Sequence, residues 1–140
     1  RATIPYENAS RSPRKANWRG MKPSWARIAR SRGNAVKLVL AAKGLPVYAH
    51  PAVSKCDQII PDLISAGLVG IEAHYIGHNQ GTTKHYLALA SKLGLLVTGG
   101  SDYHGPISGR EIALGDVSIP DELVDKLRNE HIRRNRSAGS

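Results

Sequence analysis

The sequence predicts an α/β fold in which a small parallel sheet is flanked by helices. Short, nearly continuous apolar stretches recur along the middle of the chain, and segments with helical spacing of apolar residues separate them. Glycine or proline stands at most of the boundaries between the two kinds of segment. Strands that alternate with helices in this way favour parallel pairing through crossover connections.

We expect four strands, which are too few to close a barrel because a closed barrel needs about eight. The middle of the chain therefore resembles either part of a larger (β/α) barrel or a small open sheet. In order, the expected elements are a helix at 34–44, a strand at 45–51, a helix at 56–67, a strand at 68–75, a helix at 81–94, a strand at 95–100, a short strand within 111–119 and a helix at 120–134.

The predicted helix starts are inferred from capping residues and from prolines. Asn34 is an N-cap candidate for the first helix, and Thr82 or Thr83 is one for the third. Pro61 fits the first turn of the second helix, and Pro120 fits the start of the last, where acidic residues follow it.

The predicted helix ends and strands are inferred from the positions of glycine and of β-branched residues. Gly44, Gly67 and Gly94 stand where the first three helices should end. The strand at 45–51 is closed by proline, and the strand at 95–100 runs into two glycines that allow a sharp turn.

The formal net charge of +9 is concentrated at the two ends. Residues 1–33 hold nine basic residues and one acidic residue. Residues 34–125 hold six basic and nine acidic residues, and residues 126–140 hold five basic residues and one acidic residue. We therefore expect a basic and irregular extension over 1–33, a partial α/β domain over 34–130, and a basic frayed tail over 131–140.

The basic ends leave two interpretations open. They are either solvated extensions or a surface for nucleic acid, on which Trp18 and Trp25 would stack against bases. Within the extension, residues 24–32 fit about two helical turns with Trp25 and Ile28 on one side.

The single Cys56 excludes a disulfide within the chain, which makes the cytoplasm the default compartment. No apolar run approaches the roughly 20 residues of a membrane span. The first residues lack both an initiator methionine and a secretory signal, so we expect a processed, engineered or partial chain.

Polar side chains follow the expected strands at the same end of the sheet. His50 closes the first strand, and Glu72 and His74 end the second. Asp102 and His104 follow the third, two positions apart, so extended backbone would turn both to the same side. Reactive groups gather at this edge in parallel α/β folds, and Asp and His bind the Zn²⁺, Mn²⁺ or Fe²⁺ ions that activate water. The sequence therefore predicts a metal centre here.

Each of these residues also has an ordinary structural interpretation. His50 alone could be a hydrogen-bonded residue at a strand end, and Asp102 could form an Asx turn after the glycines. Glu72 alternates with apolar neighbours and could face away from the core. His85 and His131 are expected to face solvent on their helices.

Four stretches together resemble the carboxyl-terminal half of the PHP (polymerase and histidinol phosphatase) family. The likeness runs from about Asn34 to Leu127 and is closest to the stand-alone metal-dependent phosphoesterases of that family. The combination of "AHP" with "GGSDYHG" at this separation is its most specific part. The stretches are "GLPVYAHP", "LISAGLVGIEAHYIGHN", "YLALASKLGLLVTGGSDYHG" and "LGDVSIPDELVDKL".

The resemblance implies a distorted (β/α)₇ barrel that holds a cluster of metal ions, usually Mn, Zn or Fe, and hydrolyses phosphoesters. Family substrates include nucleoside bisphosphates, the 5′ ends of short RNAs and histidinol phosphate. Position by position, His50 corresponds to the "AHP" metal ligand, and Asp102 and His104 correspond to the paired ligands of the closing motif. His78 falls where members often have a histidine near the substrate phosphate.

Part of the family's ligand set has no counterpart in this chain. The family opens with an "HxH" metal pair, whereas residues 1–49 contain no histidine and only one acid, Glu7. Truncation, a shifted upstream reading frame and fusion each fit the change of composition at Asn34.

Three functions therefore remain open at this point. The first is a phosphoesterase whose lone metal ion, on three ligands, is readily lost. The second is a non-catalytic partial barrel that binds or assembles through exposed sheet edges. The third is nucleic-acid binding through the basic ends.

Overall fold

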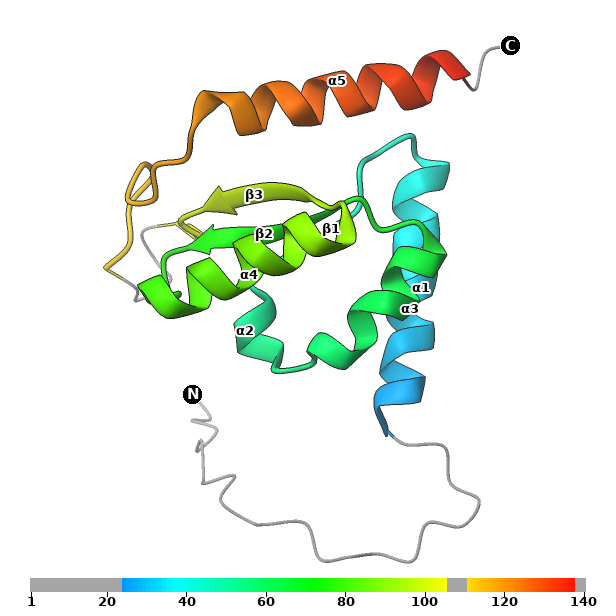
Figure 1. Cartoon of the computed structure of the whole chain (residues 1–140), viewed down its shortest axis with the longest axis horizontal. Coiled ribbons are helices and arrows are strands. Elements are labelled where there is room, and N and C mark those ends of the chain that lie inside the picture. The colour runs from blue at the N-terminus through cyan, green and yellow to red at the C-terminus, as the bar shows by residue number, and fades with distance from the viewer. Residues whose placement is uncertain (1–23, 106–110, 138–140) are drawn as a thin grey trace, which may run out of the picture.

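A computed structural model of the chain describes residues 24–105 and 111–137 (Figure 1). Its elements, in order, are α1 (Ser24–Ala41), β1 (Val47–Tyr48), α2 (Pro51–Ser54), the 3-10 helix η1 (Asp57–Ile59), α3 (Ile60–Ala66), β2 (Gly70–Tyr75), α4 (Gln80–Leu93), β3 (Leu96–Gly100) and α5 (Asp121–Ser137).

The three strands form an open parallel sheet in the order β1-β2-β3, so β2 is the central strand. The predicted parallel sheet with flanking helices is confirmed. Because the strands are parallel, their carboxyl ends lie at one edge, where the predicted site residues follow them.

Helices cover the sheet on both faces. Figure 1 shows α4 along one face of β2 and β3, and α5 along the opposite face, where it contacts β3. The helices α1 and α3 pack side by side beyond the amino-terminal end of the strands. None of the described helices combines the length and the apolar composition that crossing a bilayer requires.

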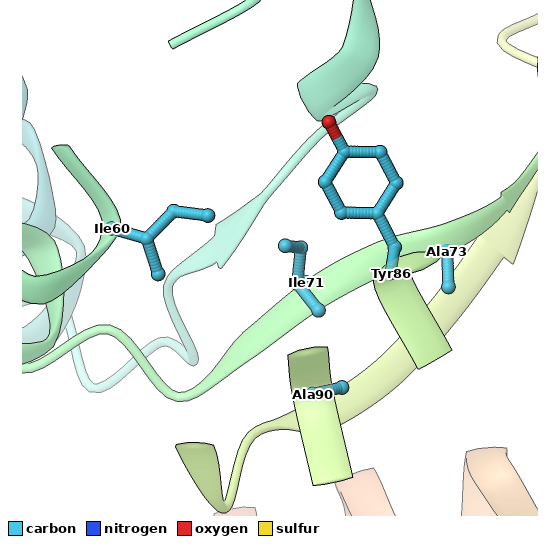
Figure 2. Packing of buried hydrophobic residues seen from close by; sticks show 5 residues of the cluster. All are labelled: Ile60, Ile71, Ala73, Tyr86 and Ala90. Carbon is cyan, nitrogen blue, oxygen red and sulfur yellow. The ribbon is translucent and has the colours of Figure 1, made fainter. Parts of the chain in front are cut away.

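Two clusters of buried side chains form the core. One joins α1, η1, α3 and the segment that leads into β2 through Val36, Ile59, Leu63 and Leu68. The other lies between β2 and α4, where Ile71, Ala73 and Ala90 have no exposed surface (Figure 2). The second cluster fixes α4 against the strand that carries Glu72 and Tyr75.

The predicted helix start at Asn34 is wrong, because α1 begins at Ser24 and is continuous to Ala41. The boundary expected between residues 33 and 34 therefore falls inside a helix. Alanine and arginine before Gly33, and alanine and leucine after it, are good helix formers that offset the roughly 1 kcal/mol that one interior glycine costs. At Gly33, a Cβ atom would lie 3.6 Å from Ala66 Cβ, so α1 passes close to α3 there.

The predicted strand within 111–119 is also wrong, since the described residues 111–119 form turns and no strand. Gly115 adopts a left-handed conformation with φ 92°. The backbone N–H of Ala113 donates to Asp116 Oδ2 at 2.6 Å. This turn chemistry bends the chain where a strand would have to run straight.

The predicted cap of α4 at Thr82 or Thr83 is wrong by one helical turn. The N-cap is Asn79, whose Oδ1 accepts hydrogen bonds from the backbone N–H of Thr82 at 2.9 Å and from its hydroxyl at 3.1 Å. An Asn side chain satisfies a free N–H of the first turn in this way, which lets the helix begin earlier.

The first helix was expected to end at Gly44, but α1 ends at Ala41 and the left-handed residue after it is Lys43, with φ 59°. The ends of α3 and α4 agree with the predictions. Pro61 lies in the first turn of α3, and Gly67 and Gly94 end α3 and α4 in left-handed conformations. The tail was expected to fray over 131–140, but α5 continues to Ser137. Residues 138–140 lie outside the described residues, as does the extension over 1–23.

The extra turn of α5 has a local cause. Glu130 accepts hydrogen bonds from Arg133 and Arg134 of the next turn. These bonds lower the pKa of the Glu130 carboxyl to about 2. Pairs at this spacing, and basic residues in the last turn, both stabilise a helix.

Candidate functional site

The end of β1 turns sharply at His50. Its backbone is left-handed, with φ 30° and ψ 59°, and Pro51 begins α2 directly after it. The His50 N–H donates to Glu72 Oε2 on β2 at 2.7 Å. A left-handed backbone is uncommon for residues other than glycine, although histidine is among the side chains that tolerate it.

The end of β3 turns in the same manner at Asp102, whose φ is 54°. His104 Nδ1 lies 2.6 Å from the backbone oxygen of Asp102 and 3.7 Å from its Oδ1. The short contact with a carbonyl oxygen requires Nδ1 to carry a hydrogen, so the neutral His104 ring has its lone pair on Nε2. Metal-binding histidines are oriented in this way, by a hydrogen bond from the other ring nitrogen.

Tyr75, the last residue of β2, links the two turns. Its hydroxyl donates to Asp102 Oδ2 at 3.4 Å. Its ring lies against the ring of His50, with centroids 5.5 Å apart. The structure thus ties His50 and Asp102, which end the two outer strands, to the same residue of the central strand.

Comparison with known proteins gives one sequence relative and two structural ones. No family model matches the chain. The chain is 40% identical over 72 residues to the phosphoribosyl 1,2-cyclic phosphate 1,2-diphosphodiesterase of Eggerthella lenta, a PHP-family protein. That match covers 51% of this chain and 28% of the relative.

The structural likeness extends further along the chain. A protein from Bifidobacterium adolescentis that is assigned as a metal-dependent phosphoesterase matches 68% of this chain with a TM-score of 0.59 and 31% identity. The matched part is 35% of that protein. The matched segment resembles the PHP family.

An amidohydrolase from Chromobacterium violaceum, solved with bound sulfate and no metal, is also similar. It matches 73% of this chain with a TM-score of 0.57 and 25% identity, and the match covers 36% of its own length. The matched segment therefore spans about a third of the length of each relative.

Asp102 and His104 fit a metal ion as a pair. They supply a carboxylate and an imidazole nitrogen, which are ligands of Zn²⁺, Mn²⁺ and Fe²⁺. However, residues 24–105 and 111–137 contain no group of three or more His, Cys, Asp or Glu side chains placed to hold an ion. His50, Asp102 and His104 follow strands or turns at one edge of the sheet, yet they do not make a complete metal centre by themselves.

His78 is held in a packed position behind Tyr75. Its Nδ1 lies 2.9 Å from the Ala73 carbonyl oxygen and so carries the ring hydrogen. The ring stacks on Tyr86 at a centroid distance of 5.3 Å and meets Tyr75 edge-on at 5.2 Å. His78 Nε2 is buried and has no hydrogen-bond partner among the described residues. The substrate contact expected for His78 stays a prediction.

The sequence placed Glu72 at this edge without a role there, and it did not identify Tyr75. Glu72 was open to the interpretation that it faces away from the core, but its carboxylate reaches the turn at His50. A carboxylate inside an otherwise apolar strand was the available signal. Nothing in the sequence pointed to Tyr75.

His85 and His131 are exposed on α4 and α5, as expected. His85 nevertheless has a partner, because its Nε2 lies 3.1 Å from Asp57 Oδ2. The other oxygen of Asp57 accepts a hydrogen bond from the buried Tyr86 hydroxyl at 2.9 Å. Burial and this bond raise the pKa of Tyr86 well above its usual value.

Proposed function

We propose that this chain contributes part of the active site of a metal-dependent phosphoesterase. The observation that carries the proposal is the arrangement of Asp102 and His104 at the carboxyl edge of the sheet. The carbonyl contact of His104 Nδ1 directs the Nε2 lone pair outward, and the Asp102 carboxylate lies beside the same ring. His50 would be the third ligand of this edge, brought toward it through Tyr75.

The proposed substrate is a phosphate ester carried on a ribose, such as a nucleotide, a sugar phosphate or an RNA 5′ end. The relative from Eggerthella lenta acts on a phosphoribosyl cyclic phosphate, and it is 40% identical to half of this chain. The chemistry that such a reaction takes from a divalent ion, here Mn, Zn or Fe, is polarisation of a phosphoryl oxygen and activation of water.

We further propose that a complete centre needs donors from outside the described residues. Structural metal sites use four protein ligands and catalytic sites use three, whereas the described residues bring no group of three candidate ligands together. Since the chain spans 28% of its sequence relative, such donors would lie in the part of a PHP protein that it does not match. The 140-residue chain should therefore bind a divalent ion weakly.

Binding of Co²⁺ to the purified chain, followed by its visible absorption, tests this proposal. Asp102→Ala and His104→Ala should each raise the Co²⁺ dissociation constant at least tenfold, because each removes one of the paired donors. His131→Ala is the matched control, since it removes an exposed histidine on α5 and should leave the dissociation constant unchanged. Equal Co²⁺ binding by all four proteins would contradict the proposal.

A further inference from the structure

We infer that Glu72 and Tyr75 are positioning residues that hold His50 and Asp102 in place at the carboxyl edge of the sheet. The inference rests on the proposed function, since His50 and Asp102 are the donors that function assigns. The outer strands β1 and β3 lead into the donors, and the central strand β2 carries the two groups that fix them.

Glu72 acts on His50 through the backbone. A hydrogen bond from an N–H to a carboxylate is short and strong, and the 2.7 Å distance here agrees with that class. The left-handed conformation of His50 costs about 1 kcal/mol or more, so it persists only where neighbouring groups enforce it. The Glu72 carboxylate is such a group, and it fixes the point from which the His50 ring projects.

Tyr75 acts on Asp102 through its side chain. The Asp102 backbone is also left-handed, and one of its carboxylate oxygens accepts from the Tyr75 hydroxyl. The other oxygen lies on the side of His104, 3.7 Å from Nδ1. Because the same tyrosine ring also packs against the His50 ring, Tyr75 sets the spacing between the two donors.

An irregularity in β2 brings Glu72 and Tyr75 to the same side of the sheet. Residues three apart in a regular strand point to opposite faces. In β2, Glu72 pairs with Thr98 but His74 pairs with Gly99, so two steps along β2 match one step along β3. Tyr75 then pairs with Gly100, which lies on the same side of β3 as Thr98. Bulges of this kind redirect side chains next to functional sites.

Two readouts on the full chain test the inference. In the first, Tyr75→Phe and Glu72→Ala should each raise the Co²⁺ dissociation constant about tenfold, the effect expected for groups that orient a ligand. Tyr103→Phe and Glu111→Gln are the matched controls, since both residues are exposed, and they should bind Co²⁺ like the wild type.

The second readout needs no metal. Amide hydrogen exchange at His50, measured by NMR, should speed up at least tenfold in Glu72→Ala, because the acceptor of that N–H is lost. Glu72→Gln keeps an oxygen acceptor and should restore part of the protection. A variant that only loosened the whole fold would instead speed up exchange throughout the core, including Ile71.

The two readouts separate the inference from the proposed function. If Asp102→Ala loses Co²⁺ but Tyr75→Phe and Glu72→Ala bind it like the wild type, the inference is overturned and the proposed function stands. If the wild type binds no Co²⁺, the proposed function fails, and the exchange rate of the His50 amide alone then tests the inference about Glu72. An unchanged rate in Glu72→Ala then overturns the inference, and a specific rise supports it.

Discussion

Asp57 connects the buried Tyr86 of the second core cluster to the exposed His85. It accepts a hydrogen bond from the Tyr86 hydroxyl, and its other oxygen lies beside His85. Tyr86 itself is only 3% exposed, so its hydroxyl has little access to water as an alternative partner. Hydrogen bonds to a charged acceptor contribute more to stability than neutral ones, and a buried group left without a partner is costly.

We predict that Tyr86→Phe lowers the free energy of unfolding by about 1–2 kcal/mol at pH 7, because Asp57 loses one of its two partners. Burial, the hydrogen bond to Asp57 and its charge all raise the Tyr86 pKa. Above about pH 10 the unfolded chain therefore loses this proton while the folded chain keeps it, so the stability of the wild type falls as the pH rises.

The difference between the two proteins should accordingly shrink between pH 7 and pH 11. Urea unfolding followed by circular dichroism at both pH values measures it. Tyr103→Phe is the control, because Tyr103 is 39% exposed and its replacement should change stability little. A Tyr86→Phe variant as stable as the wild type at pH 7 would show that the bond to Asp57 contributes nothing.

At the scale of elements, β2 and β3 approach most closely at Gly99. A Cβ atom there would overlap His74 Cβ, and it would lie 2.5 Å from the His74 carbonyl oxygen and 2.7 Å from Ile119 Cγ2. Two of these three neighbours are backbone or the first side-chain atom, so they cannot move aside without shifting β2. The glycine makes room for the irregular pairing of β2 that the positioning of Glu72 and Tyr75 requires.

We predict that Gly99→Ala lowers the free energy of unfolding by about 2 kcal/mol or more, through overpacking between the two strands. Gly100→Ala is the matched control, because its Cβ would meet only Glu72 Oε1, at 3.8 Å. Thermal unfolding of both variants measures the effect. Equal midpoints for the two alanine variants would show that the strands can separate there at little cost.

The sequence predicts the elements well where one residue determines a boundary by its own backbone preference. Gly67, Gly94 and Pro61 are such residues, and the structure confirms each. The sequence predicts element boundaries poorly where several neighbouring residues could each form the boundary. Asn79 and Thr82 are both good N-caps, and which one caps α4 depends on where the preceding loop leaves β2.

The candidate site follows the same rule. His50, Asp102 and His104 could be found because strand ends are visible in the sequence. The common side of Glu72 and Tyr75 could not be predicted, because it depends on a register shift between two strands that lie far apart in the chain.

At the scale of the whole molecule, the sheet has two edges, formed by β1 and β3. Beside β1 lies a mostly apolar groove of about 540 Å³, lined by residues of α1, α3 and the β1 segment that include Val39, Val47 and Leu63. Open sheet edges and exposed apolar surface both favour association between chains.

We therefore predict that the chain self-associates as its concentration rises and that Val39→Lys shifts it toward the monomer. Val39 lines the groove and is 39% exposed, so a charge there should oppose burial against a second copy. Val53→Lys on α2 is the matched control, because Val53 is 61% exposed and does not line the groove. Sedimentation velocity over a range of concentrations measures association, and a monomer at every concentration would contradict the prediction.

The uneven pairing of β2 with β3 makes the stretch from Glu72 to Tyr75 sensitive to its length as well as to its side chains. An insertion or a deletion of one residue there would invert the facing of every later side chain in the strand. Glu72 would still reach the turn at His50, while Tyr75 would be carried to the opposite face, away from Asp102. Loss of a single codon in this stretch would thus separate the two halves of the site even with every named side chain still present.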